Sequence, residues 1–300
     1  MIARSMIAPP PQGRPPSPSP LSLAYSVDAD DAFMFHAIRE GLVDGGGLTF
    51  THQRLDTAAL NRLALAGGAD VIAISAGAYP SVAARYQLLP HGASVGRGFG
   101  PVVVARAPMT PDDLAGRTVG IPGLTTTAWL VLRLIQPAAV PVEIPIAPFA
   151  GIFDALERGD IDAALLIHEG RMLYPARGLQ KVVDLGEWWA AATGLPLPLG
   201  VNVIRRALGP DVVARASAVL RASIGYALGH RQQLIASIAA EDRGDKALAN
   251  PALIDDYLKL YANDDTAAMA ADARHATAVL FQRARAAGLL AQDVVVDFAP

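Results

Sequence analysis

Short apolar runs alternate with segments of helical periodicity along most of the chain. Each run spans only four or five residues and is bounded by polar residues, Gly or Pro, which favours strands over buried helices. Strands that alternate with helices predict an α/β protein whose sheets carry helices on both faces. The predicted strands are Leu21–Tyr25, Leu48–His52, Val71–Ser75, Val102–Ala105, Thr118–Ile121, Val142–Ile146, Ala163–Ile167 and Val201–Arg205.

Capping residues mark helix boundaries. Asp56-Thr57 precedes the apolar positions Leu60 and Leu63, and Gly67 follows them, so a capped helix is predicted between the second and third strands. After residue 206 the pattern changes, and strand signals nearly disappear until Val294. The helices predicted in this C-terminal third are Asp211–His230, Gln232–Ala240, Pro251–Tyr261 and Thr266–Ala287.

Three hundred residues exceed what one hydrophobic core usually holds, so two domains are expected. Two βαβ-rich parts followed by a helical return segment match a two-lobed type II periplasmic-binding-protein-like fold. We expect residues 21–105 plus 201–300 to form a larger α/β lobe and residues 106–200 a smaller one, with crossings near Arg106 and Leu199. The Pro-rich residues 1–20 are expected to form a disordered tail.

Composition narrows the functional classes. Hydrophobic residues make up 52% of the chain and charged residues 18%, as in a globular protein. The 25 basic and 28 acidic residues give a net charge of −3 without a basic stripe, so nucleic acid is not an expected partner. No long charge-free apolar span or signal-peptide run is present, which predicts a cytoplasmic protein without a membrane span. The chain has no cysteine, so thiol catalysis is excluded.

Polar residues that directly follow apolar strands are the candidate site residues, because ligands of open α/β sheets bind beyond the carboxyl ends of the strands. Ser75 ends one strand, in Ala73-Ile74-Ser75-Ala-Gly77. This stretch lacks the first glycine of a nucleophile elbow, so a ligand-binding hydroxyl or a helix cap is favoured over a hydrolytic serine.

Three consecutive hydroxyl residues, Thr125 to Thr127, stand at a predicted helix start. Free backbone N–H groups and the helix dipole attract anions there, so the segment is a candidate site for a carboxylate or phosphate. Ordinary N-capping is the alternative.

His168 follows five apolar residues and precedes Glu169. Adjacent side chains of an extended segment point to opposite sides, so the imidazole is expected to face the crevice while Glu169 points away. No histidine pair has metal-ligand spacing, so a base or hydrogen-bonding role is favoured over a metal site, and a structural role stays open.

Four motifs together resemble the 1,4-dihydroxy-6-naphthoate synthase family of menaquinone biosynthesis by the futalosine pathway, and their order and spacing match over about residues 21–290. They are Gly96-Arg-Gly-Phe-Gly-Pro, Ile167-His-Glu-Gly-Arg, Val183-Asp-Leu-Gly-Glu-Trp-Trp and Thr193-Gly-Leu-Pro-Leu-Pro-Leu-Gly.

The resemblance implies a lyase that converts cyclic dehypoxanthinyl futalosine, a small acidic molecule, to 1,4-dihydroxy-6-naphthoate without a cofactor. The family's proton-abstracting histidine corresponds to His168. The ligand contacts of the family correspond to two segments of this chain. One contains Ala73, Ile74 and Ser75, and the other contains Thr126 and Thr127.

The chain departs from the family pattern in two places. The first strand of the family usually ends Ser-Pro-Cys-Pro-Asn-Asp-Thr, but here Ser26-Val-Asp-Ala-Asp-Asp-Ala keeps only Ser26 and Asp31 and adds Asp28 and Asp30. A basic residue common before the strand-end serine is replaced by Ala73. A diverged paralogue, a chorismate dehydratase-like enzyme and a non-catalytic anion-binding protein therefore remain alternatives.

Overall fold

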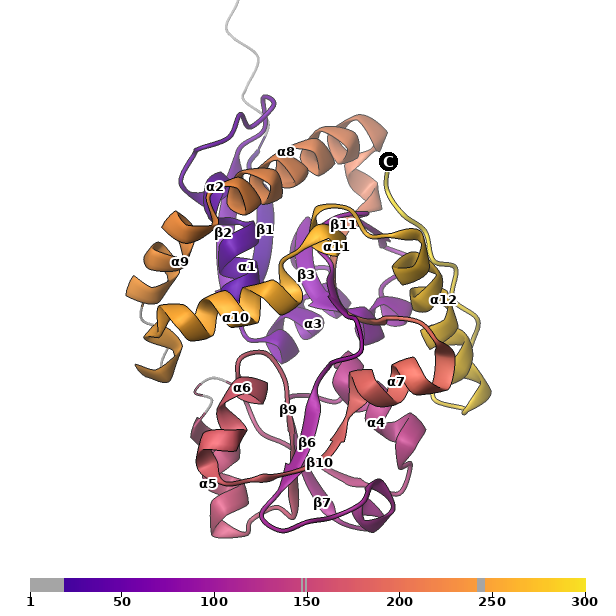
Figure 1. Cartoon of the computed structure of the whole chain (residues 1–300). Helices are drawn as coiled ribbons and strands as arrows, with labels where there is room; N and C mark the ends of the chain where they lie inside the picture. The colour runs from indigo at the N-terminus through magenta and orange to yellow at the C-terminus, as the bar shows by residue number, and fades with distance from the viewer. Residues whose placement is uncertain (1–18, 147, 149, 242–245) are drawn as a thin grey trace, which may run out of the picture.

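Two β-sheets, each with its own helices, form two lobes in the computed structural model of the chain (Figure 1). The structure describes residues 19–146, 148, 150–241 and 246–300. The tail predicted over residues 1–20 therefore lies almost entirely outside the described residues. Among these described segments, no helix combines the length and apolarity needed to cross a bilayer.

The first sheet has strand order β2-β1-β3-β11-β4, with β5 paired to β11. Strands β1, β2 and β3 run parallel, whereas β11 is antiparallel to β3, β4 and β5. The carboxyl ends of β1 and β3 therefore meet at one edge. The strands of this sheet are β1 (Leu21–Ser26), β2 (Phe50–Leu55), β3 (Val71–Ser75), β4 (Tyr86–Leu88), β5 (Ser94–Gly96) and β11 (Leu197–Arg205).

The second sheet has strand order β10-β6-β9-β7-β8. Strands β7, β8 and β9 run parallel, and β6 is antiparallel to both of its neighbours. Its strands are β6 (Val102–Ala105), β7 (Thr118–Ile121), β8 (Val140–Glu143), β9 (Ala163–Leu166) and β10 (Gln180–Asp184).

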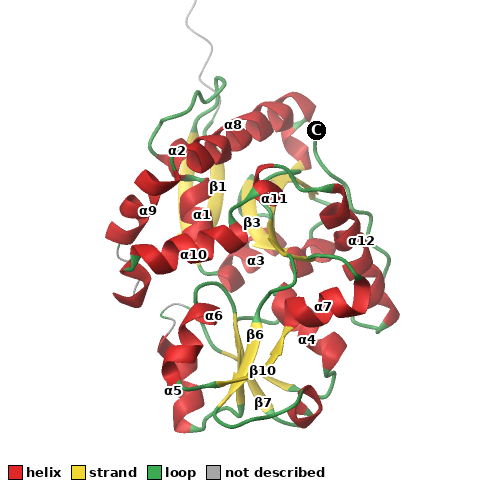
Figure 2. Ribbon diagram, viewed as in Figure 1, coloured by secondary structure: helices red, strands yellow, loops and turns green. Residues whose placement is uncertain are grey.

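Helices cover both sheets, as the alternating pattern predicts (Figure 2). In the second lobe and at its junction with the first they are α4 (Thr127–Ile135), α5 (Ala150–Arg158), α6 (Gly170–Leu173) and α7 (Leu185–Thr193). In the first lobe they are α1 (Ala29–Met34), α2 (His36–Arg39), α3 (Thr57–Ala66), α8 (Pro210–Gly229), α9 (Arg231–Ala240), α10 (Pro251–Tyr261), α11 (Asp264–Ala267) and α12 (Ala271–Ala286).

Local chemistry sets the helix ends. Asp56 caps α3 by accepting a hydrogen bond from the backbone N–H of Ala59 at 2.8 Å, and Gly67 ends the helix with a φ of 69°. The segment predicted as one helix over Thr266–Ala287 is instead split into α11 and α12, because Ala268 and Ala270 adopt extended backbone between them.

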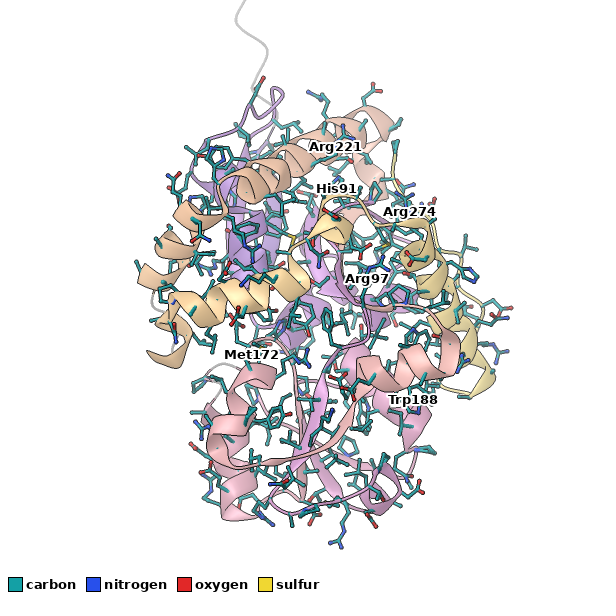
Figure 3. All side chains as sticks on the ribbon, viewed as in Figure 1. His91, Arg97, Met172, Trp188, Arg221 and Arg274 are labelled. Atoms are coloured by element: carbon teal, nitrogen blue, oxygen red, sulfur yellow. The ribbon has the colours of Figure 1, made fainter. Side chains whose placement is uncertain are left out.

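The chain crosses between the sheets earlier at both points than the sequence predicts. Strand β6, assigned to the larger lobe, pairs with β9 and β10 of the second sheet. Leu197 and Pro198, assigned to the smaller lobe, begin β11 and pair with β5 of the first sheet. These assignments were wrong because an apolar run does not show which sheet it joins. Arg97, labelled in Figure 3, lies just before the first crossing and pairs with Asp265 and Asp272 at 2.7 Å each.

One hydrophobic cluster joins the lobes. It includes Ile74 and Val203 of the first sheet together with Val103 and Leu165 of the second. Helix α10 of the C-terminal segment lies along the side of the first lobe that faces α6 (Figure 1). The helical return segment therefore also contributes to the region between the lobes.

Candidate active site

A pocket enclosing about 720 Å³, which includes space open to solvent, lies where the strand ends of both sheets meet. All six predicted site residues line it: Ala73, Ile74, Ser75, Thr126, Thr127 and His168. Ser26, Asp28, Asp30, Asp31, Thr57, Ser94, Asn202, Tyr257 and Tyr261 add further polar groups.

His168 follows β9 and bends the chain sharply at the pocket. Its φ is 49°, a left-handed value found at no other non-glycine residue of the described segments. Such a conformation costs on the order of 1–2 kcal/mol for a residue with a Cβ. The surrounding contacts therefore hold the backbone of His168 in a strained conformation.

Both ring nitrogens of His168 have partners from the opposite lobe. Nδ1 lies 2.7 Å from Asp28 Oδ2 and 3.2 Å from the Tyr257 hydroxyl, and Nε2 lies 3.0 Å from Thr57 Oγ1. The neighbouring Glu169 is not among the described residues that line the pocket, but it reaches the same loop as His168: its Oε1 accepts a hydrogen bond from the backbone N–H of Ala29 at 3.1 Å. His168 and Glu169 thus both link the second lobe to the loop after β1.

The charge state of His168 depends mainly on Asp28. Burial disfavours the imidazolium, but the Asp28 carboxylate outweighs it, with smaller contributions from Asp30 and Glu169, and raises the pKa of His168 to about 9. Burial opposes ionisation of Asp28 as well, yet the charge and hydrogen bond of His168 hold the pKa of that carboxyl well below its usual range. The pKa of His168 therefore lies well above the ordinary imidazole value near 6.5.

Two more buried carboxyl groups lie beside the pair. Tyr257 and Ser94 donate hydrogen bonds to the two oxygens of Asp30, at 3.2 Å and 2.6 Å. Burial and the charge of Asp28 raise the pKa of Asp30 well above its usual value. The same two causes raise the pKa of Asp31 to about 7. Burial and the neighbouring charge thus both favour the protonated form of Asp30 over its carboxylate.

A cation could bind at one place in this cluster. Ligand atoms of Asp28, Asp30 and His168 all lie within 4.8 Å of one another. The three residues come from two distant segments, so no spacing in the sequence reveals the group. Asp30 and His168 already have hydrogen-bonding partners within the protein, whereas Asp28 Oδ1 has none among the described residues.

The Ser75 end of the pocket is held by neutral hydrogen bonds. Asn61 Oδ1 accepts a bond from the backbone N–H of Ser75 at 3.0 Å, and Asn61 Nδ2 donates to Ser75 Oγ at 3.2 Å and to Thr125 Oγ1 at 3.1 Å. Each hydroxyl accepts from this amide and keeps its own proton for a further bond. No general base appears among these partners of Ser75, and a ligand-binding hydroxyl fits this geometry better than a nucleophile.

Thr126 and Thr127 hold the start of α4. Thr126 Oγ1 donates to the Gly123 carbonyl at 2.8 Å and accepts from the backbone N–H of Trp129 at 3.2 Å, so it caps the helix. Thr127 Oγ1 accepts from the backbone N–H of Gly77 at 2.9 Å and donates to the Leu199 carbonyl at 2.7 Å. Both hydroxyls are therefore engaged with backbone, and the first-turn N–H groups of α4 are left as the donors for an anion.

Sequence reasoning missed five polar residues of the pocket: Thr57, Ser94, Asn202, Tyr257 and Tyr261. Thr57 was interpreted only as a helix start, and Asn202 lies inside a predicted strand. Tyr257 and Tyr261 are buried on α10, nearly 90 residues after His168. Only the three-dimensional return of the C-terminal segment brings them to the pocket. Arg and Lys are absent from the described residues that line it, so His168 is the one lining side chain that carries positive charge.

Comparison with known proteins identifies the family. A sequence profile described as menaquinone biosynthesis matches residues 21–286. The chain belongs to the menaquinone biosynthesis family. A 1,4-dihydroxy-6-naphthoate synthase of Streptomyces coelicolor is 36% identical over 285 residues, covering 90% of this chain and 94% of the relative. The synthase of the same name from Thermus thermophilus is 36% identical over 273 residues, covering 90% and 96%.

Solved structures have a similar fold. Protein AF1704 of Archaeoglobus fulgidus superposes with a TM-score of 0.83 at 38% identity, covering 90% of this chain and 98% of that one. The alkanesulfonate-binding protein of Xanthomonas axonopodis pv. citri superposes with a TM-score of 0.69 at 14% identity, covering 93% and 97%. The second likeness concerns the fold alone and confirms the periplasmic-binding-protein-like architecture.

Proposed function

We propose that this chain is a lyase that converts cyclic dehypoxanthinyl futalosine to 1,4-dihydroxy-6-naphthoate, with His168 as the general base. The observation that carries the proposal is the His168–Asp28 pair at the junction of the two lobes. Family relatives named as 1,4-dihydroxy-6-naphthoate synthases support the reaction. Asp28 fixes Nδ1, so Nε2 is the nitrogen that remains for the substrate once Thr57 releases it.

The base acts in its neutral form. With a pKa of about 9, only about 1% of the imidazole is neutral at pH 7, so the rate should rise as the pH approaches 9. The imidazolium formed by proton abstraction is then stabilised by Asp28, without a change of partner. Burial and the charge of Asp28 raise the pKa of Asp30, so we assign to this carboxyl the proton that goes to the departing sugar-derived part of the substrate.

The acidic group of the substrate is assigned to the opposite end of the pocket. The first-turn N–H groups of α4 and the hydroxyl of Ser75 provide donors there. Ala73 and Ile74 form the strand surface beside them. Binding from both lobes also excludes water from the reacting atoms.

A second candidate is a family member whose substrate is less acidic. It is favoured by the three buried carboxyl groups and by the lack of Arg and Lys among the described lining residues. Both candidates use the same base.

Incubation of the purified protein with cyclic dehypoxanthinyl futalosine, followed by absorbance and mass detection of naphthoate, tests the proposal. The wild-type protein should form 1,4-dihydroxy-6-naphthoate, and His168→Ala should not. Absence of product from correctly folded wild type would exclude the proposed reaction and favour the second candidate.

A further inference from the structure

Asn202 carries a buried side-chain amide that no protein group satisfies. The residue lies in β11 and is 1% exposed. Among the described residues, neither its Oδ1 nor its Nδ2 has a hydrogen-bonding partner. Buried polar groups are nearly always paired, so an unpaired amide beside a pocket indicates a group that bonds something from the pocket.

Small residues pack around the Asn202 amide. Asn202 pairs with Ala73 across the β3–β11 ladder, and directly opposed side chains of antiparallel strands share one face of the sheet. Gly92 lies on another side, where a Cβ would come within 2.0 Å of Asn202 Nδ2. All three residues line the pocket. Two of the smallest side chains therefore flank the amide, and neither can bond to it.

Asn61 shows what a structural amide looks like in the same pocket wall. It is also fully buried, but its Oδ1 and Nδ2 are both used, and they join Ser75 to Thr125. An amide that holds the fold together is thus satisfied within the protein. Asn202 is of the same residue type and equally buried, yet it lacks these bonds.

The chemistry of the free amide selects its partner. One donor and one acceptor are both open, so the complementary group must itself accept and donate. A hydroxyl does both, whereas a carboxylate only accepts, and the buried Asp28, Asp30 and Asp31 in the same pocket disfavour further negative charge.

We propose that Asn202 binds a hydroxyl-bearing, sugar-derived part of the substrate. This assignment rests on the proposed function, because the substrate named there carries such a part. It adds a specificity residue to the site: the α4 end receives the acidic group, His168 the reacting proton, and Asn202 the hydroxyls. A substrate that lacks these hydroxyls would leave the amide buried and unpaired, which is the basis of its rejection.

Asn202→Leu tests the proposal, because leucine keeps the volume and removes both polar atoms. We expect the KM for cyclic dehypoxanthinyl futalosine to rise about 10- to 100-fold, as for the loss of one or two hydrogen bonds. We expect the change in kcat to be smaller and the melting temperature to stay equal or rise. The matched variant Asn61→Leu should instead lower the melting temperature. A KM within twofold of wild type, or a melting temperature lowered as much as by Asn61→Leu, would overturn the role of Asn202.

Calorimetric titration with D-ribose separates this inference from the proposed function, and it decides the matter if wild type forms no naphthoate. Saturable millimolar binding by wild type that is lost in Asn202→Leu would support the Asn202 site even though the proposed reaction had failed. Failure of wild type both to turn over the substrate and to bind ribose would overturn both. Normal turnover by Asn202→Leu would overturn the Asn202 site alone and leave the proposed reaction standing.

Discussion

The two ends of the pocket are built from opposite kinds of interaction. At the α4 end, Ser75, Thr126 and Thr127 are tied to backbone or amide groups by neutral hydrogen bonds. At the other end, the partly buried His168 forms an ion pair with the buried Asp28, beside two further buried carboxyl groups. Neutral hydrogen bonds shape a binding surface and change the pKa values of nearby groups little, whereas buried charges shift those pKa values by several units. The first end is suited to holding a ligand and the second to moving protons.

The largest expected effect comes from removing the imidazole at the charged end. His168→Ala should lower kcat by about 10²- to 10⁴-fold, as for other general bases, while substrate affinity is largely kept. Steady-state kinetics with calorimetric binding would measure both quantities. The exposed His275 provides a control, since His275→Ala should leave kcat unchanged. If His168→Ala kept more than about a tenth of the wild-type kcat, the base would have to be another group, and Asp30 or Asp31 would be the next candidates.

The charge pair predicts a pH profile whose position depends on Asp28. In wild type the neutral base forms as the pH passes about 9, so kcat/KM should rise up to that pH. Asp28→Asn removes the charge that raises the pKa of His168 and leaves the effect of burial, which lowers it. The rising limb should therefore move by about two or more pH units toward acid. Profiles between pH 6 and 10 would show it, and a limb that stays near 9 would contradict the pairing.

The sequence predicted the neutral end of the pocket much better than the charged end. Ser75, Thr126, Thr127 and His168 each directly follow an apolar strand or begin a helix, and these are local signals. The partners of His168 come from Asp28, Thr57 and Tyr257, which lie up to 140 residues before it and 89 after it in the chain. A pKa depends on burial and on the nearest charges, and neither can be inferred from the neighbouring residues in the sequence.

The strands, too, were predicted well where the local sequence carries a clear signal and poorly where it does not. Strands β3, β6 and β7 begin and end at the predicted residues, because each is a continuous apolar run. Strands β4, β5 and β10 were missed, since each is short or carries polar residues such as Gln180 and Lys181. Strand β8 lies earlier than the predicted Val142–Ile146, where it is parallel to β7 and half exposed at the edge of its sheet.

A smaller effect is expected at the neutral end. Thr127→Val keeps the shape of the side chain but removes the hydroxyl between Gly77 N–H and the Leu199 carbonyl. Two buried backbone groups lose their partner, so we expect a loss of about 1–3 kcal/mol in stability, or roughly 2–6 °C in Tm, with only a modest rise in KM. Thr51→Val, at an exposed position of β2, should change Tm little. A large fall in kcat without a change in Tm would mean that the Thr127 hydroxyl acts on the substrate instead.

An effect of similar size concerns Asp31, but it appears only as a dependence of stability on pH. Its pKa is raised from the ordinary 3.8 to about 7, so the folded protein holds a proton that the unfolded chain releases between these values. Stability from this group should therefore fall as the pH rises from about 4 to 7, and stay low above 7.

The variant Asp31→Asn tests this dependence. An amide side chain does not titrate, so the variant should not lose stability over this pH range. The Tm of Asp31→Asn minus the Tm of wild type should increase by roughly 2–6 °C between pH 5 and pH 8. Scanning calorimetry in matched buffers measures this difference. The exposed Asp293→Asn should show a constant difference over the same range. A constant or shrinking difference for Asp31→Asn would mean that the carboxyl ionises in the folded protein as easily as in water, and that the charge contrast between the two ends is weaker than the burial of Asp31 implies.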